Sequence, residues 1–345
     1  MMKKSLVAVA VMAVSGMASA QSTVTIYGLI DAYFGSVKSG TLTQTVVNSG
    51  GLQSSRFGFK GTEDLGGGLK ANFVLEAGFN VDTGASRAYD NPYTNAATTA
   101  MFGRQTFVGL SGGFGEVKLG KMWTPFDEVK GSGAAGFDAN VFAPATNVWS
   151  SNSYSDLPGN AIYYSTPNFS GFSAAVMHSF GENKTATVGA GSISSMNVAY
   201  SAGPLAAALS YQTQKSTGAV AATKYTQLNG SYDLGVVKLL GAYGTTKNQS
   251  SPVTTLAQEK TKEYQLGLDF PVSSTFTLSG GYARSKGTRA AGASELKRTG
   301  YGIAGLYAMS KRTNLYAGYQ NAKETAAGLA DRKDSTVGVG VRHTF

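Results

Sequence analysis

Apolar and polar residues alternate along two runs of the stretch from Ser54 to Phe79, which reads SSRFGFKGTEDLGGGLKANFVLEAGF. In both runs one parity is mainly apolar, and the other carries Arg, Lys, Asn and Glu. A period of two is typical of a β-strand with one apolar and one polar face. The Gly- and Asp-rich segment 63–68 predicts a turn, because these residues adopt the positive φ angles that hairpins need. Such a hairpin fits either a soluble β-sandwich or a barrel that stands between lipid and water.

The same alternation recurs along the chain in segments of about 9–14 residues, the length that a tilted membrane strand needs. No convincing long stretch of helical periodicity interrupts it. The pattern predicts sixteen strands, at 22–35, in the two halves of the 54–79 hairpin, and at 98–111, 114–122, 160–166, 170–180, 193–201, 205–214, 223–232, 236–246, 261–270, 275–286, 297–309, 313–323 and 334–345.

The connections between the predicted strands alternate in length. Every second connection is a turn of two to six residues, and the others are longer, at 36–50, 81–97, 123–159, 182–192, 215–222, 247–260, 287–296 and 324–333. In an antiparallel meander, alternate connections lie at opposite ends of the sheet. Short turns at one rim, long loops at the other and an even strand number are typical of outer-membrane barrels, with both termini on the short-turn side. The sequence therefore predicts an all-β protein, a 16-stranded antiparallel transmembrane β-barrel.

Charged residues on the faces opposite the apolar parity favour a water-filled lumen over a filled soluble core. They include Arg56, Lys60, Arg104, Lys118 and Asp269. An unpaired charge in a dry core is very costly, whereas water in a lumen hydrates it. The charge pattern thus favours the membrane barrel over the sandwich.

Composition narrows the remaining classes. The chain has no cysteine, which excludes a small disulfide scaffold. Its formal net charge is +9, but the bases are scattered singly, so no nucleic-acid partner is expected. Residues 1–20 combine two lysines, a short apolar run and the ending Ala18-Ser19-Ala20, the pattern of a cleaved secretory signal. We therefore expect a signal peptide at 1–20 and one barrel domain at 21–345.

The residue types that catalysis and metal binding require are scarce. The two histidines are His178 and His343, and His178 is next to Ser179, so their side chains point to opposite faces of a strand. No Cys/His spacing for a metal exists. We expect no enzyme activity, no catalytic residues, no cofactor and no metal.

The longest connection, 123–159, is expected to narrow the channel. A sixteen-stranded barrel is wider than its own side chains fill. The presence of large aromatic residues in the loop favours packing inside the barrel over an outward-facing loop; they include Trp123, Phe126, Phe137, Phe142 and Trp149. Opposed charges across a narrow pore filter solutes by size and charge. The predicted constriction has an acidic loop side, with Asp127, Glu128 and Asp138, and a basic wall, with Arg56, Arg104 and Lys60.

Several motifs resemble the general porins of Gram-negative outer membranes, in particular the β-proteobacterial and neisserial branch. They are VTIYGLIDAYF at 24–34, SRFGFKGTEDLGGGLKANFVLE at 55–76, FGRQTFVGLSGGFGEVKLGKMWTP at 102–125, YSTPNFSGFS at 164–173, YAMSKRTNLYAGY at 307–319 and GVRHTF at 340–345. The resemblance implies a homotrimer in the outer membrane, in contact with lipid and lipopolysaccharide, with one pore per subunit for small hydrophilic solutes and ions. It also implies that the third long loop folds into the lumen.

One departure from this family concerns the strand after the long loop, which commonly carries a basic residue. Here residues 160–164 read NAIYY, without one, which puts strong anion preference in doubt. Two rival functions stay open: a substrate-specific channel with a binding site at the constriction, and a closed barrel that acts as an adhesin or structural protein.

The last strand ends in an aromatic residue, Phe345, on the same face as three valines. This resembles the C-terminal signal that the outer-membrane assembly machinery reads. A plain closing strand that pairs with 24–34 is the alternative, and both hold together without conflict.

Overall fold

A computed structural model describes residues 23–345, apart from 91–92, 94–96, 220, 250–257 and 289–294. The expected signal peptide at 1–20 lies outside the described residues. Among the described helices, none has the length and apolarity needed to cross a membrane.

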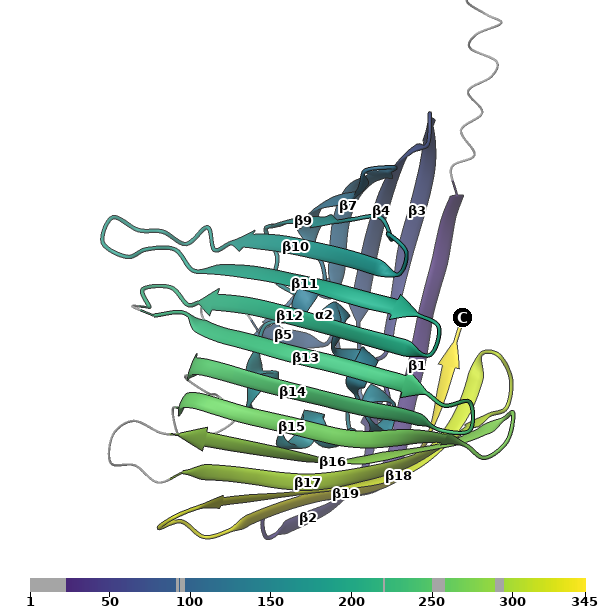
Figure 1. Ribbon diagram of the computed structural model, residues 1–345, viewed down its shortest axis with the longest axis vertical. Helices are drawn as coiled ribbons and strands as arrows, with labels where there is room; N and C mark the ends of the chain where they lie inside the picture. Colours follow the sequence, from purple (N-terminus) through teal and green to yellow (C-terminus); the bar gives the residue numbers. More distant parts are fainter. Residues whose placement is uncertain (1–22, 91–92, 94–96, 220, 250–257, 289–294) are drawn as a thin grey trace, which may run out of the picture.

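Antiparallel strands form one sheet that closes on itself, since β1 pairs with β19 (Figure 1). A separate two-stranded sheet consists of β5 (Ala88–Asp90) and β6 (Ala97–Thr99). The strands of the large sheet are β1 (Thr23–Ser39), β2 (Leu42–Ser49), β3 (Arg56–Gly66), β4 (Leu69–Gly78), β7 (Gln105–Gly112), β8 (Gly115–Lys121), β9 (Ala161–Ser165), β10 (Phe172–Phe180), β11 (Ser192–Ala202), β12 (Leu205–Lys215), β13 (Thr223–Asp233), β14 (Lys238–Gln249), β15 (Gln258–Pro271), β16 (Phe276–Thr288), β17 (Leu296–Ala308), β18 (Thr313–Ala326) and β19 (Arg332–Thr344).

The barrel has sixteen strand positions, as predicted, because two of the 17 strands share one position. β2 pairs with residues 32–39 of β1, and β3 pairs with residues 23–29 of the same strand. The two strands are thus halves of one barrel strand, separated by residues 50–55. We call this segment, which lies in the wall, the strand break.

Two predicted boundaries are wrong. The expected long loop at 36–50 is the end of β1 and all of β2, joined by a turn at Gly40 and Thr41. Thr and Val favour strand there, but the two faces of LTQTVVNS do not differ in polarity, so alternation gave no signal. The strand expected to begin at 98 begins at Gln105, because β6 pairs with β5 instead of the barrel.

The two faces of the wall differ in polarity as the alternation predicts. On the outer face, large apolar side chains such as Val24, Leu266 and Val339 are exposed. On the inner face, polar side chains such as Gln212 and Gln265 are buried. An outward apolar band and a polar interior are typical of barrels in lipid.

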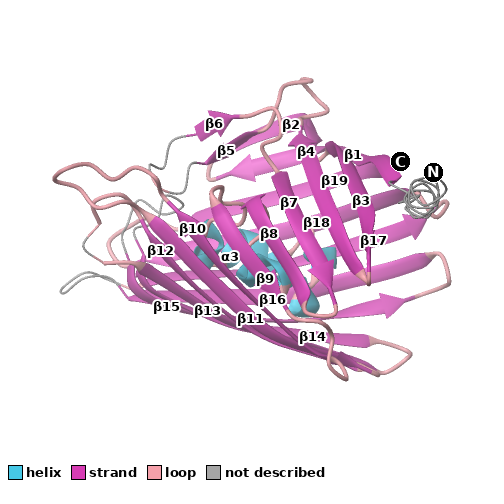
Figure 2. Cartoon of the chain, turned by 90° about the horizontal axis from the view of Figure 1, so that it is seen from above, coloured by secondary structure: helices cyan, strands magenta, loops and turns pink. Residues whose placement is uncertain are grey.

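The segment 123–159, here called the inner loop, lies inside the barrel (Figures 1 and 2). It contains α2 (Pro125–Glu128), η1 (Lys130–Gly133), η2 (Gly136–Asp138), α3 (Pro144–Val148) and η3 (Ser150–Ser153). Proline stands at the first turn of α2 and α3, where the missing N–H has no cost. These short helices pack against the inner faces of β10 to β18.

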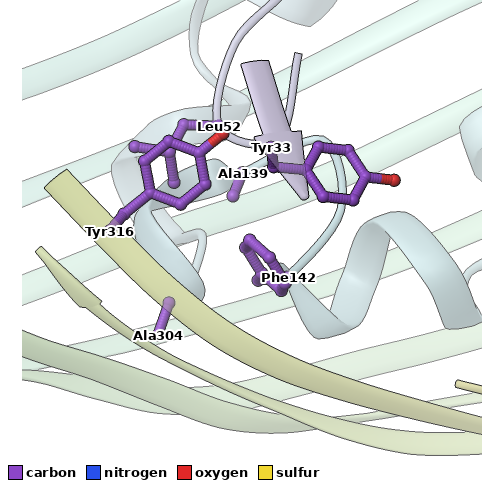
Figure 3. Close-up of a cluster of buried hydrophobic side chains, with 6 residues drawn as sticks. All are labelled: Tyr33, Leu52, Ala139, Phe142, Ala304 and Tyr316. Atoms are coloured by element: carbon purple, nitrogen blue, oxygen red, sulfur yellow. The ribbon is translucent and has the colours of Figure 1, made fainter. Parts of the chain in front are cut away.

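Glycines on the wall make room for the inner loop. A Cβ atom on Gly302 would lie 2.0 Å from the carbonyl oxygen of Phe142, and one on Gly318 would lie 2.6 Å from its ring. The Phe142 side chain is fully buried among Tyr33, Leu52 and Tyr316 (Figure 3). The apolar core of this barrel therefore lies between the inner loop and the wall.

Candidate channel constriction

A cavity of about 630 Å³ lies between the inner loop and the wall formed by β1, β3, β4 and the start of β7. It brings together five of the six charged residues that the sequence predicts for the constriction. Four basic and three acidic side chains line it, which leaves an excess of one positive side-chain charge: Arg56, Lys60, Arg104, Lys130, Glu76, Asp127 and Asp138.

Glu76 organises the basic wall. Its carboxylate is 3% exposed and accepts a hydrogen bond from Arg104 Nε to Oε1 at 2.7 Å. The Arg56 Nε atom lies 3.8 Å from Oε2, which also accepts a hydrogen bond from the Tyr27 hydroxyl at 3.0 Å. One buried acid thus accepts a charge-assisted hydrogen bond from Arg104 and lies within ion-pair distance of Arg56.

Aromatic rings lie against two of the basic side chains. The Arg104 guanidinium lies 5.1 Å from the ring centroid of Trp123, and the Lys60 ammonium lies 5.1 Å from that of Tyr27. Such contacts hold a cation in place without neutralising its charge. The Arg56 side chain remains 24% exposed, so its charge faces the lumen.

The acids of the inner loop are paired within the loop. Asp127 accepts a hydrogen bond from the Tyr154 hydroxyl, and its Oδ1 atom lies 3.1 Å from the Lys130 ammonium. Thr124 caps α2, its hydroxyl accepting from the Asp127 amide at 3.3 Å. Burial raises the pKa of Asp138, and the charge of Lys130 opposes that rise. A lysine from the same segment therefore offsets one of the two acidic charges of this side.

Glu128 is not among the residues that line this cavity. Its Oε2 atom accepts a hydrogen bond at 3.0 Å from the hydroxyl of Tyr163, which lies on β9. Burial raises the pKa of Glu128 to about 7. That hydrogen bond and the charge of Lys118 oppose part of the rise. Asp127 and Glu128 are adjacent on one helical turn and so point to different parts of the lumen.

Sequence reasoning missed Tyr27, Glu76, Trp123 and Lys130 as parts of this site. Glu76 and Tyr27 do carry a signal, because both lie on the polar parity of their strands. Lys130 follows Asp127 by three residues, a spacing that pairs charges on a helix. That spacing is informative only in a helical segment, and the sequence did not predict the short helix α2.

The strand break attaches the middle of the inner loop to the wall. The amides of Asn140 and Val141 donate to the carbonyl oxygens of Leu52 and Gly51 at 3.0 and 3.1 Å. The break is itself held by Asp31, whose carboxylate accepts from the amides of Gly51, Leu52 and Gln53 at 2.8–3.0 Å. This carboxylate is fully buried, and its partners satisfy it.

Glu263 attaches the end of the inner loop on the far side of the barrel. This buried carboxylate on β15 accepts from the Ser150 amide at 2.6 Å and from the Ser285 hydroxyl at 2.6 Å. The Trp149 indole donates to the Tyr264 carbonyl oxygen at 3.3 Å. Together with the strand break, this contact holds the inner loop against separate parts of the wall, which keeps the cavity at a defined width.

Phe345 lies where the barrel closes. Its amide donates to the Gly28 carbonyl oxygen, and the Gly28 amide donates to the Phe345 carbonyl oxygen, both at 3.1 Å. The ring covers Gly28, where a Cβ atom would lie 2.6 Å from it. The last residue thus completes the pairing of β19 with β1.

Comparison with known proteins identifies the family. The model of the Gram-negative porin family matches residues 7–327. Outer membrane porin protein 32 of Delftia acidovorans is 38% identical over 226 residues, which cover 62% of this chain and 61% of that protein. An outer membrane porin protein of Bordetella pertussis is 32% identical over 403 residues, covering 100% of both chains.

Solved structures agree with this result. An anion-selective porin from Comamonas acidovorans superposes with a TM-score of 0.76 and is 29% identical, over 94% of this chain and 100% of that one. OmpT of Vibrio cholerae, in a trimer form, has a TM-score of 0.69 at 17% identity, over 94% of this chain and 99% of that one, and shares the fold. The chain belongs to the Gram-negative porin family, whose members are passive outer-membrane channels for small solutes rather than enzymes.

Proposed function

We propose that this protein conducts ions and small hydrophilic solutes through the cavity between its inner loop and its basic wall, with a preference for anions. The charge of the cavity lining carries the proposal: bases exceed acids by one, and the exposed Arg56 faces the lumen. Fixed charges at a narrow point attract ions of opposite sign. The Comamonas porin, a structural relative, is described as anion-selective.

The constriction has two unequal sides in this proposal. The basic side consists of Arg56, Lys60 and Arg104, and the two arginines share the single carboxylate of Glu76, at 3.8 and 2.7 Å. The acidic side consists of Asp127 and Asp138, which face Lys130. Lys130 offsets one of the two loop acids and Glu76 offsets one of the three wall bases, so the basic side keeps the larger excess of charge and sets the sign of the field that a permeating ion meets.

Assembly and orientation are part of the same proposal. Membership of the porin family favours a homotrimer in a membrane that contains lipopolysaccharide. It also favours periplasmic termini and removal of residues 1–20. The barrel presents a broad apolar outer face, which suits contact with lipid and with neighbouring subunits. Phe345, as the terminal aromatic residue of the closing strand, suits recognition by the assembly machinery.

Single-channel recording of the refolded mature chain in a planar bilayer under a KCl gradient tests the proposal. We expect open channels with a reversal potential on the anion side, closing in three equal steps if each subunit of a trimer has its own pore. A reversal potential on the cation side would contradict the charge argument. Silence from folded, inserted protein would instead favour a closed barrel, and saturable flux of one solute would favour a substrate-specific channel.

A further inference from the structure

Lys130 occupies an unusual position among the lumenal bases, because it belongs to the acidic side of the constriction. Its ammonium lies 3.1 Å from Asp127 Oδ1, and the side chain remains 33% exposed in the cavity. Its charge also acts on the carboxylates of Asp138 and Asp156. One lysine therefore interacts electrostatically with three acids of the inner loop.

A permeating cation would be drawn to these acids if they were free. Two opposite charges a few ångströms apart attract by about 1 kcal/mol in water and by several times more at the lower effective dielectric of a protein surface. Lys130 is part of the chain, so its ammonium group has a very high effective concentration beside these acids. A mobile cation must compete with it for the same carboxylates.

We propose that Lys130 is a built-in counter-ion that blocks cation binding at the inner loop and so determines the ion preference of the channel. The inference rests on the proposed function, because it requires ions to pass through this cavity. It assigns the selectivity to a residue of the acidic side, in addition to the arginines of the wall.

Lys118 on β8 provides a matched comparison. Its ammonium lies 3.0 Å from Glu116 Oε2, nearly the distance of the Lys130–Asp127 pair. Like Lys130, it lies near aromatic rings, those of Phe107 and Tyr163. It does not line the cavity between the loop and the arginines. Removal of either lysine changes the net charge of the barrel equally, but only Lys130 is positioned to control the constriction.

The experiment compares reversal potentials of wild type, Lys130→Met, Lys130→Arg and Lys118→Met in a KCl gradient. We expect Lys130→Met to shift the permeability ratio toward K⁺ by about tenfold. We expect Lys130→Arg and Lys118→Met to stay close to wild type. Equal ratios for Lys130→Met and Lys118→Met would overturn the proposal.

Charge restoration separates a counter-ion from a residue that only supports the loop. Adding Asp127→Asn to Lys130→Met removes the unpaired acid, so we expect the ratio to return toward that of wild type. Asp127→Asn alone should shift the ratio toward Cl⁻, and it tests the idea even if Lys130→Met does not fold. No shift in Asp127→Asn would count against the inference, whereas a silent wild-type barrel would refute the proposed function itself.

Discussion

The hydroxyl group of Tyr316 on β18 donates a hydrogen bond to Asp31 Oδ1 on β1 at 2.5 Å, across 285 positions of sequence. The same carboxylate binds three successive amides of the strand break, and the break binds the inner loop. Two barrel strands are thereby connected to the loop that narrows the channel. Most of the connection runs through backbone groups, and its side-chain members include Asp31, Tyr316 and Asn140, whose amide donates to the Gly50 carbonyl oxygen.

Tyr316→Phe should loosen the inner loop. It removes a hydrogen bond to a buried carboxylate, a loss of about 1.5–3 kcal/mol. We expect a lower unfolding temperature of the refolded barrel and a larger, noisier single-channel conductance, because the loop leaves the wall. Thr336→Val is a control, since it removes the Gln320–Thr336 hydrogen bond between β18 and β19. Conductance noise equal in the two variants would argue against a specific role for Tyr316.

Glu76→Gln should strengthen anion preference and weaken the barrel together. It leaves the buried Arg104 without its carboxylate at 2.7 Å, and breaking a buried pair from one side costs about 3–5 kcal/mol. The two wall arginines then face the lumen without compensation. We expect a reversal potential further toward the anion side and a reduced yield of folded protein. A shift toward the cation side would contradict the assignment of Glu76 as the acid of the basic wall.

Glu128 should make the stability of the loop depend on pH. Since its pKa is raised in the folded channel, mainly by burial, its contribution to stability is fully present below the pKa of a free glutamate. That contribution is lost as the pH rises through the raised value. We expect the unfolding temperature of the wild type to fall as the pH rises from about 4.5 to about 7, and that of Glu128→Gln to fall less. Identical pH profiles for the two proteins would disprove the effect.

Gly302→Ala should displace the inner loop without preventing barrel closure. A Cβ atom there would lie 2.0 Å from the Phe142 carbonyl oxygen, a distance that forces the backbone of the loop to move. We expect a changed single-channel conductance with normal folded yield. Gly230→Ala is the control, because the nearest atom to its Cβ would be 3.5 Å away. If Gly302→Ala conducts like Gly230→Ala, the close packing at Phe142 does not set the channel width.

Deletion of Phe345 should lower assembly into the membrane without altering the conductance of the channels that form. The deletion removes two backbone hydrogen bonds to Gly28 and the ring that covers it, at a place where the side chain does not carry charge into the cavity. Counting inserted channels and recording single-channel conductance measures the two effects separately. Normal assembly of the shortened chain would contradict the prediction.

The sequence predicts the wall better than the constriction, for a physical reason. Alternation over each strand is local, so sixteen strands and the polarity of both faces follow from it. It fails at 36–50, where the Thr-rich extension has no apolar face. The bases Arg56 and Arg104 were identified because a lumen explains charge on a strand. Lys130 and the position of Glu128 depend on how an irregular loop packs against distant strands, and no local pattern encodes that packing.

The attachment of the inner loop also fixes an order of events. The amide of Gly136 binds Ser279, which is 143 residues later, and the amide of Ser150 binds Glu263, which is 113 residues later. These partners are on strands that follow the loop in the chain, and contacts between such distant segments form late. A nascent barrel that lacks β15 and β16 lacks these two attachments, and holds the middle of the loop through the strand break. The inner loop therefore acquires its full set of attachments only after the strands that follow it have been added, so the width of the channel depends on residues from both halves of the chain.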